Sequence, residues 1–312
     1  GRLIATAAPR RALALCLAAI AGASCRPASR EPGPALASAH PDAPWTLVYE
    51  QVVAGNQDLF LVPAGGGVPR RLTDDPAHDS LPRFTPDGRS VLFTSDRTGN
   101  YQVWEVPAAG GPARRVRSNA HTEWQVDLSP DGRRLAFLSN QEGPEHLFVL
   151  DMVSGGEKAL ARHGKGSILG NPDWDAASRR VVFSSNWRIG HQIYVVDADT
   201  GEEKRLSAFS AGGCEPRWRP DGRRVVYVKR GHLSERSRLV EHDPATGAET
   251  VLVDWPALNY DPAYSPDGSE LAFASNITGE YAVYRQRLSD GKSWRVTHGA
   301  GDARYPDYAP AP

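Results

Sequence analysis

The side chains most suited to chemistry lie in or beside the connections between short apolar runs, and they include acids, imidazoles, guanidinium groups and aromatic rings. The candidate binding residues are His121, Glu123, Trp124, Asn171, Trp187, Glu215, Tyr260, Asp261, Arg304 and Tyr305. Such groups around one mouth could hold a peptide, a sugar or a metal, because connections on a rigid scaffold commonly carry binding residues. The acids Glu123, Glu215 and Asp261 would favour basic or hydrogen-bond-donating ligands.

A catalytic role is the alternative hypothesis, and it rests on His121, His191 and His232. One of them would act as base or metal ligand in a polysaccharide lyase-like enzyme, with Arg97 or Arg304 neutralising a uronate carboxylate. The histidines lack the fixed spacing of a metal motif, so we predict no metal and no cofactor. The sequence also has no Gly-x-Ser-x-Gly elbow, no His-Glu-x-x-His, no Walker loop and no dinucleotide fingerprint. We therefore favour non-catalytic binding or scaffolding.

A repeat with a period of about 45 residues must position these side chains. Its strongest unit ends in Pro-Asp-Gly and occupies residues 82–88, 126–132, 216–222 and 262–268, with a degenerate copy at 172–178. In this tripeptide proline presets φ near about −65°, Asp caps the turn and Gly supplies the positive φ. Each copy therefore joins two short antiparallel strands. The repeated aspartates are turn residues rather than a catalytic set of carboxylates.

Each repeat continues with two further strands, which gives four short antiparallel strands per unit. Units of this kind, arranged radially, are the blades of a β-propeller. The first blade begins with only three strands, at residues 46–49, 58–61 and 70–73, and the chain ends with an isolated strand at Tyr305–Pro310. We predict that this strand completes the first blade. The chain would then be all-β and close as a six-bladed β-propeller of four-stranded antiparallel blades.

Strand parity assigns the connections to two faces. The Pro-Asp-Gly and Gly-Gly turns, such as 85–88 and 110–111, share one face, which we call the hairpin face. The longer second-to-third-strand and blade-to-blade connections must share the opposite one, the loop face. We expect Glu123, Glu215 and Asp261 just before inner strands, at the channel mouth on the loop face. A structural alternative is also open, in which these acids bond neighbouring loop amides and the aromatic candidates cover the ends of blades.

The Ser/Thr-Pro-Asp-Gly units, together with residues 93–99 (Phe-Thr-Ser-Asp-Arg-Thr-Gly), resemble the WD40-like (PD40) repeats of TolB-type propellers. Similar repeats occur in relatives of prolyl oligopeptidase. The resemblance covers essentially residues 45–310 and implies the propeller fold, but no particular activity, because propellers host many. We expect neither the separate α/β domain of periplasmic TolB, for which only a short linker precedes Trp45, nor the hydrolase domain that follows the propeller in prolyl oligopeptidases.

Residues 1–25 are typical of an export signal, because Arg10 and Arg11 precede an apolar run too short to span a membrane permanently. Two cleavage sites compete. Residues 21–23 (Ala-Gly-Ala) suit a signal peptidase, whereas Ala-Ser-Cys at 23–25 resembles the end of a bacterial lipobox. We favour lipidation of Cys25, and we expect an exported protein, either periplasmic or an outer-membrane lipoprotein.

Composition narrows the range of partners. The 36 Lys and Arg residues nearly balance the 37 Asp and Glu residues, so no overall field attracts nucleic acid or an anionic membrane. Residues 26–44, rich in Pro, Ala and Ser, are a predicted linker to the propeller at 45–312, where Cys214 has no partner for a disulfide. We predict a monomer that binds an envelope protein, peptide or glycan and meets the membrane only through a lipid anchor.

Overall fold

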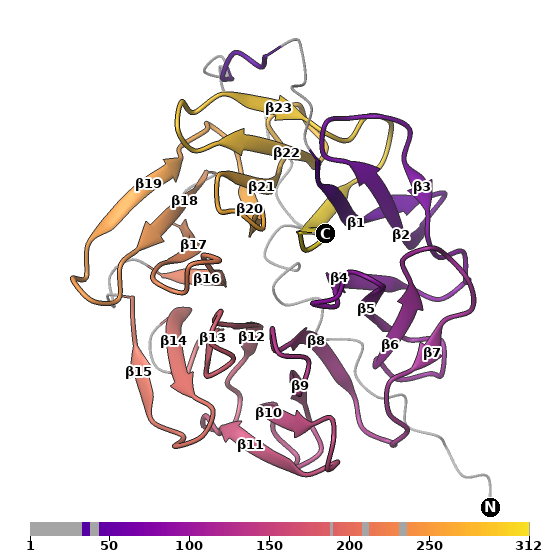
Figure 1. Cartoon of the computed structure of the whole chain (residues 1–312), viewed down its shortest axis with the longest axis vertical. Helices are drawn as coiled ribbons and strands as arrows, with labels where there is room; N and C mark the ends of the chain where they lie inside the picture. The colour runs from indigo at the N-terminus through magenta and orange to yellow at the C-terminus, as the bar shows by residue number, and fades with distance from the viewer. Residues whose placement is uncertain (1–32, 38–43, 188–189, 208–211, 231–235, 312) are drawn as a thin grey trace, which may run out of the picture. The chain divides into compact units, whose positions relative to one another are not determined.

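The described residues of the computed structural model form six four-stranded antiparallel sheets around a central axis, as Figure 1 shows. The structure describes residues 33–37, 44–187, 190–207, 212–230 and 236–311. We number the sheets as blades 1 to 6 in the order in which the chain reaches them. The predicted export signal lies outside the described residues, as does part of the predicted linker. Within the described residues, no helix has the length and hydropathy needed to cross a membrane.

In each blade four strands follow one another from the axis outward. Blade 1 contains β24 (Ala303–Tyr308), β1 (Thr46–Val53), β2 (Asn56–Pro63) and β3 (Arg70–Arg71). Blade 2 contains β4 (Asp79–Phe84), β5 (Ser90–Ser95), β6 (Gln102–Pro107) and β7 (Arg114–Arg115). Blade 3 contains β8 (Glu123–Leu128), β9 (Arg134–Ser139), β10 (His146–Asp151) and β11 (Glu157–Ala161). Blade 4 contains β12 (Leu169–Trp174), β13 (Arg180–Ser185), β14 (Gln192–Asp197) and β15 (Glu203–Arg205). Blade 5 contains β16 (Gly213–Trp218), β17 (Val225–Arg230), β18 (Ser237–His242) and β19 (Glu249–Val253). Blade 6 contains β20 (Asn259–Tyr264), β21 (Glu270–Ser275), β22 (Ala282–Arg287) and β23 (Ser293–Arg295).

The C-terminal strand closes the ring, as the sequence predicted. β24 pairs antiparallel with β1, with Leu47 opposite Tyr308 and Gln51 opposite Ala303. The N-terminal strand of the propeller and its last strand therefore share one sheet, which Figure 1 shows as indigo and yellow arrows side by side. No other strand of the described chain holds the two ends of the ring together, so the closure depends on this pairing.

Every inner strand carries a β-bulge at its third residue. These six residues have a positive φ: Leu81, Gln125, Asn171, Glu215, Asp261 and Tyr305. The register with the second strand shifts at the same place in each blade, for example between Ser80 and Arg83 in blade 2. A bulge bends a strand and redirects its side chains, here around the channel. The inner strands thus begin earlier than predicted, which places Glu123, Glu215 and Asp261 inside β8, β16 and β20 rather than before them.

The core lies between neighbouring blades. The second strand of every blade buries one aromatic side chain, at Tyr49, Phe93, Phe137, Phe183, Tyr227 and Phe273. Each faces the bulge of its own inner strand, and apolar residues of the preceding blade pack with Tyr49, Phe93 and Phe137. Burying an aromatic ring of this size contributes roughly 1.5–3 kcal/mol. Repeated in six blades, this packing makes the propeller a rigid frame for the channel.

Candidate functional site

The bulge residues link the blades to one another. The backbone N–H of a bulge donates to a side chain of the preceding blade, so that Asn171 donates to Gln125 Oε1 at 2.8 Å and Asp261 donates to Glu215 Oε2 at 2.7 Å. In the same way Tyr305 donates to Asp261 Oδ2 at 3.3 Å. Two of the predicted acids therefore bond the backbone of a neighbouring inner strand. The structural alternative holds for them, although the amides are those of bulges rather than of loops.

Glu215, Asp261 and Glu50 converge on one guanidinium group, in an assembly that we call the Arg304 cluster. Arg304 Nε lies 2.9 Å from Asp261 Oδ2, and its Nη2 lies 4.0 Å from Glu215 Oε1. The guanidinium also faces three tyrosine rings, with centroids 5.4 Å away in Tyr260, 4.9 Å away in Tyr281 and 4.9 Å away in Tyr305, which completes the cluster. Cation–π contacts of this kind are stronger in desolvated sites.

Burial changes the ionisation of the cluster. It raises the pKa of Glu50 to about 7 and that of Glu215 to about 8, and for Glu215 the charge of Asp261 adds to the effect. Burial alone would lower the pKa of Arg304, but Asp261, Tyr305 and Glu215 together hold it well above its usual range. Three carboxyls share the guanidinium group of Arg304, and a second guanidinium group, that of Arg230, lies 5.9 Å from the Tyr260 centroid. The remaining surplus of carboxyls favours a further positive charge or protons on the glutamates.

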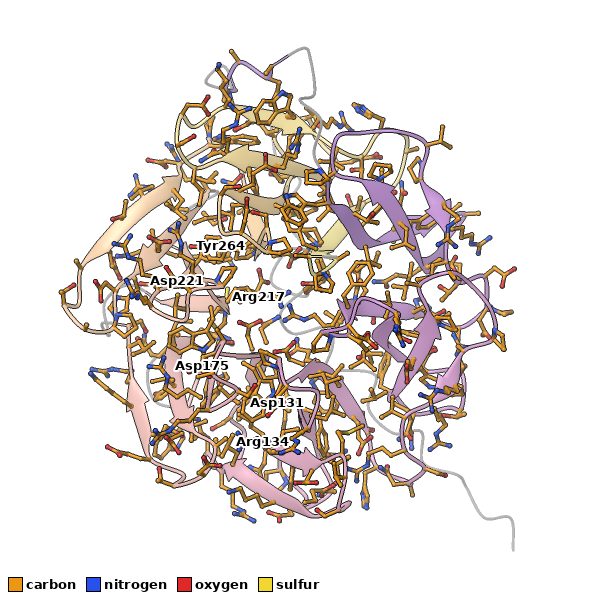
Figure 2. All side chains as sticks on the ribbon, viewed as in Figure 1. Asp131, Arg134, Asp175, Arg217, Asp221 and Tyr264 are labelled. Carbon is orange, nitrogen blue, oxygen red and sulfur yellow. The ribbon has the colours of Figure 1, made fainter. Side chains whose placement is uncertain are left out.

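A second group of charges lines the channel closer to the hairpin face, at the fifth residue of the inner strands. This Arg83 cluster consists of Arg83, Asp127, Asp173, Arg217 and Asp307. Arg83 Nη1 lies 3.6 Å from Asp307 and 3.8 Å from Asp173, and Arg217 Nη1 lies 3.2 Å from Asp173. Figure 2 shows Arg217 close to the centre of the ring. Burial raises the pKa of Asp127 to about 7 and that of Asp307 to about 6.

The Arg83 cluster was not identified among the candidate residues in the sequence. The signal that could have found it is the residue two places after each bulge, which is Arg or Asp in five of the six copies. Each aspartate also accepts a backbone bond from the next inner strand, as when Trp218 N donates to Asp173 Oδ2 at 2.6 Å. A cavity of about 10 Å³ is lined by bulge residues together with Arg83 and Arg217. The two levels of the channel are therefore close to each other.

The other predicted candidates are separate from the Arg304 cluster. Glu123 is the first residue of β8, not a bulge residue, and its buried carboxylate lies 3.1 Å from Arg117 Nε. Trp124 is buried, whereas His121 is exposed. Trp187 is 40% exposed and stacks on His163 at 4.6 Å.

The histidines proposed for a lyase-like enzyme come from different blades. His121 precedes blade 3, and His191 lies within blade 4 with its pKa lowered, mainly by burial. His232 lies outside the described residues. Within the described ranges, no group of three or more His, Cys, Asp or Glu side chains has the geometry to hold a metal ion.

Known proteins similar to this chain contain the same kind of repeat and the same fold. The model of the family described as the TolB β-propeller domain (PD40) matches residues 12–129 and 126–254, which is more than half of the chain. The chain belongs to this family. The resemblance of its repeats to the PD40 repeats of TolB-type propellers is confirmed.

Curated PD40 relatives match over short segments. An uncharacterized protein of Agrobacterium fabrum is 33% identical over 95 residues, which is 30% of this chain and 30% of that protein. The Tol-Pal system protein TolB of Bordetella pertussis is 56% identical over 41 residues, which is 13% of this chain and 9% of that protein. The matched segments therefore span less than a third of these relatives.

Solved structures show the fold over more of the chain. The crystal structure of TolB from Acinetobacter baumannii superposes with a TM-score of 0.76 at 18% identity, covering 87% of this chain and 68% of that one. An oligogalacturonate lyase in complex with manganese superposes with a TM-score of 0.54 at 17% identity, covering 82% of this chain and 73% of that one. At these identities the likeness concerns the propeller alone.

Proposed function

We propose that this PD40 propeller is a non-catalytic binding or scaffolding protein of the bacterial cell envelope. Its partner is a protein, a peptide or a glycan, engaged through the loop face at the channel mouth. A relative named for the Tol-Pal system supports a protein partner. Support for the binding role comes from the frame itself, since the blades are fixed to one another and present their longer connections on one face.

The observation that carries the proposal is the surplus of carboxyl groups in the Arg304 cluster. Glu50, Glu215 and Asp261 share one guanidinium group in a largely desolvated setting. A basic side chain of a partner placed at the mouth would compensate this surplus, because charge interactions strengthen as water is excluded. Exposed residues on the same face, including His121 and Trp187, would then supply the surrounding contact area.

A pull-down from envelope extracts tests this function with conservative variants. Glu215→Gln removes the ionisable carboxyl group but keeps an oxygen that can accept the Asp261 N–H, and Trp187→Ala removes an exposed ring. We expect each variant to retain about tenfold less partner than the wild type, and binding to weaken with added salt. Val251→Ala, an exposed position on the outer strand β19, is the matched control and should retain the partner in full. Full retention by both loop-face variants would refute the proposal.

The location of the protein belongs to the same proposal. Arg10, Arg11 and the apolar run that follows them would direct export, and Cys25 would carry a lipid; all lie outside the described residues. We expect the wild type to fractionate with membranes and the variant Cys25→Ala to appear in the soluble periplasmic fraction. Soluble periplasmic wild type would exclude lipidation, and cytoplasmic wild type would exclude export.

A further inference from the structure

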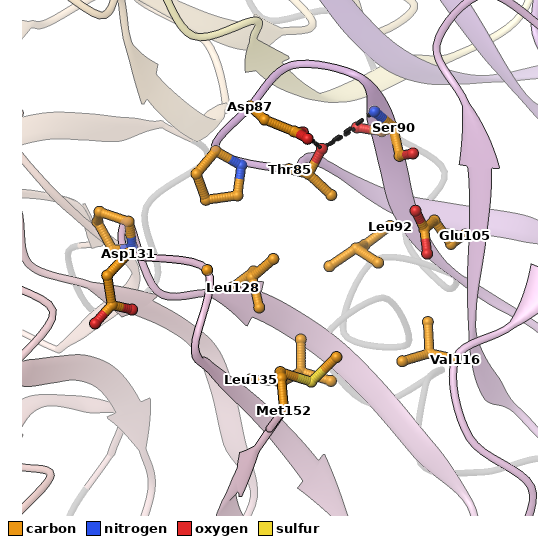
Figure 3. Close-up of a pocket in the computed structure, with 13 residues that line it drawn as sticks. Thr85, Asp87, Ser90, Leu92, Glu105, Val116, Leu128, Asp131, Leu135 and Met152 are labelled. Carbon is orange, nitrogen blue, oxygen red and sulfur yellow. Dashed lines mark hydrogen bonds between the residues drawn. The ribbon is translucent and has the colours of Figure 1, made fainter. Parts of the chain in front are cut away.

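A pocket of about 440 Å³ opens on the hairpin face between blades 2 and 3, and Figure 3 shows the side chains around it. Its apolar wall consists of Leu92 and Val116 from blade 2 with Leu128, Leu135 and Met152 from blade 3. Met152 is 42% exposed at the rim. Pockets of this volume are large enough for a ligand or for the side chains of a partner.

The next two junctions of the propeller show one way in which this place is filled. The last residue of the inner strand is Trp174 in blade 4 and Trp218 in blade 5, and both rings are buried. The preceding blade covers each ring with a guanidinium group from the start of its second strand. Arg134 lies 4.9 Å from the centroid of Trp174, and Arg180 lies 4.5 Å from that of Trp218.

The covering arginines also reach the turn of the next blade. Arg134 donates to the carbonyl oxygen of Ser178, and Arg180 donates to that of Gly222 at 3.0 Å. An aromatic ring, a guanidinium group and a turn carbonyl thus form one repeated unit at these two junctions. Desolvated stacking of this kind is favourable for both the ring and the cation.

At the junction of blades 2 and 3 both side chains of this unit are missing. Ser90 occupies the place of the arginine at the start of β5, and Leu128 occupies the place of the tryptophan at the end of β8. The equivalent turn residue, Gly132, lines the pocket. The pocket therefore has the position that the ring and the guanidinium group hold in blades 4 and 5.

The charge of the pocket complements the missing cation. Asp87, Asp131 and Glu105 line it, and among its described lining residues none is basic. Asp87 and Asp131 are exposed, and the pKa of each is lowered, chiefly by the hydroxyl of Thr85 or Ser129, so both are ionised at neutral pH. Glu105 is paired with Arg114, whose side chain is 75% exposed.

We propose that this pocket is a second docking site, which takes an adjacent aromatic and arginine pair from a protein partner. The ring would pack against Leu92, Leu128 and Leu135, while the guanidinium group would approach the Gly132 turn and Asp131. The partner would thereby complete the unit that blades 4 and 5 build from their own chain. This site is on the opposite face from the one in the proposed function and does not depend on it.

The experiment uses a capped tetrapeptide probe, acetyl-Ala-Trp-Arg-Ala-amide, titrated calorimetrically into the whole protein. We expect saturable binding, and about tenfold weaker binding for the same peptide with Glu in place of Arg. The double variant Ser90→Arg, Leu128→Trp rebuilds the missing unit. It should lose peptide binding and melt a few degrees higher, since it fills a void with a paired ring and cation.

Two further variants complete the test. If the double variant does not fold, Met152→Arg, at an exposed rim position, should block the peptide without affecting the core. The loop-face variant Trp187→Ala should bind the peptide as the wild type does, which separates this site from the proposed function. No saturable binding to the wild type, equal binding to the filled or Met152→Arg variant, or a lower melting temperature of a folded double variant would overturn the proposal.

Discussion

The Arg304 cluster and the pocket between blades 2 and 3 are made by the same repeat, but they differ in whether the repeat supplies the side chains that fill the position. In the cluster, Asp261 accepts hydrogen bonds from both Arg304 and the backbone N–H of Tyr305, so groups of the repeat itself satisfy this buried carboxylate. In the pocket, Ser90 and Leu128 stand where the next two junctions have an arginine and a tryptophan. Positions that follow the repeat therefore hold the blades together, whereas positions that depart from it leave space in which a ligand could bind. Both regions are proposed to bind a partner, the cluster through its surplus of carboxyl groups and the pocket through the space that the missing pair leaves.

The largest effect that would break this comparison comes from the closing strand. Deleting residues 303–312 removes β24 together with Arg304, Tyr305 and Asp307, and leaves β1 with an unpaired edge. We expect loss of soluble folded protein, measured by expression yield and circular dichroism. A chain that ends at Pro310 keeps β24 and serves as the control. A deleted chain that melts at the wild-type temperature would disprove closure.

Arg304→Met should have the next largest effect, because it leaves Asp261 and Glu215 buried without their cation. Removing one partner of a buried ion pair typically costs about 3–5 kcal/mol of unfolding free energy. The control is Arg114→Met, which breaks an exposed pair with Glu105 and should change the unfolding free energy by less than about 1 kcal/mol. Equal losses in chemical denaturation would show that the cluster does not carry the stability assigned to it.

A third variant sharpens the comparison by opening a pocket at a junction that a buried ring and its cation fill. Arg134→Ser with Trp174→Leu gives the junction of blades 3 and 4 the residues found at blades 2 and 3. We expect a loss of about 2–4 kcal/mol in unfolding free energy, because a buried ring and its cation are removed from a packed site. The loss would be measured in urea. An unchanged unfolding free energy would mean that the aromatic unit is not a stabilising part of the repeat.

The sequence predicted the six blades and their closure, but not where the inner strands begin, and it predicted only part of the site. Turn chemistry and strand alternation are local, so Pro-Asp-Gly copies and apolar runs were enough to predict six blades and the closing strand. The hydroxyl of Thr85 donates to Asp87 Oδ1 at 2.6 Å, in agreement with the predicted turn role. Of the ten candidate residues, Glu215, Tyr260, Asp261, Arg304 and Tyr305 do come together.

What the sequence could not predict depends on the bulges. A bulge adds one residue to a strand, so the side chains that follow it point in a different direction than strict alternation would give. No local sequence pattern predicted where these bulges lie. For this reason Glu123 was grouped with Glu215 and Asp261 although it stands two residues before its own bulge residue, Gln125. The pocket was missed for a different reason. Ser90 and Leu128 are ordinary residues, and only alignment of the junctions in space reveals what they replace.

The smallest expected effect is a pH dependence that arises from the channel clusters. Because burial raises the pKa of Glu50 to about 7 and that of Glu215 to about 8, the folded protein binds more protons than the unfolded chain between roughly pH 5 and 8. The free energy of unfolding should therefore fall as pH rises through this range. Glu215→Gln should make the slope shallower, measured by denaturation at each pH. An identical slope in the variant would show that Glu215 is ionised in the folded state throughout.

The most direct test of the central claim, that the loop face binds an envelope partner, is site-specific photo-crosslinking in cells that produce the protein. A photoreactive amino acid would replace Trp187 on the loop face, with Val251 on the outer strand as the reference position. We expect an adduct of discrete mass, containing another envelope component, from position 187 and none from position 251. No adduct from position 187, or the same adducts from both positions, would contradict the account.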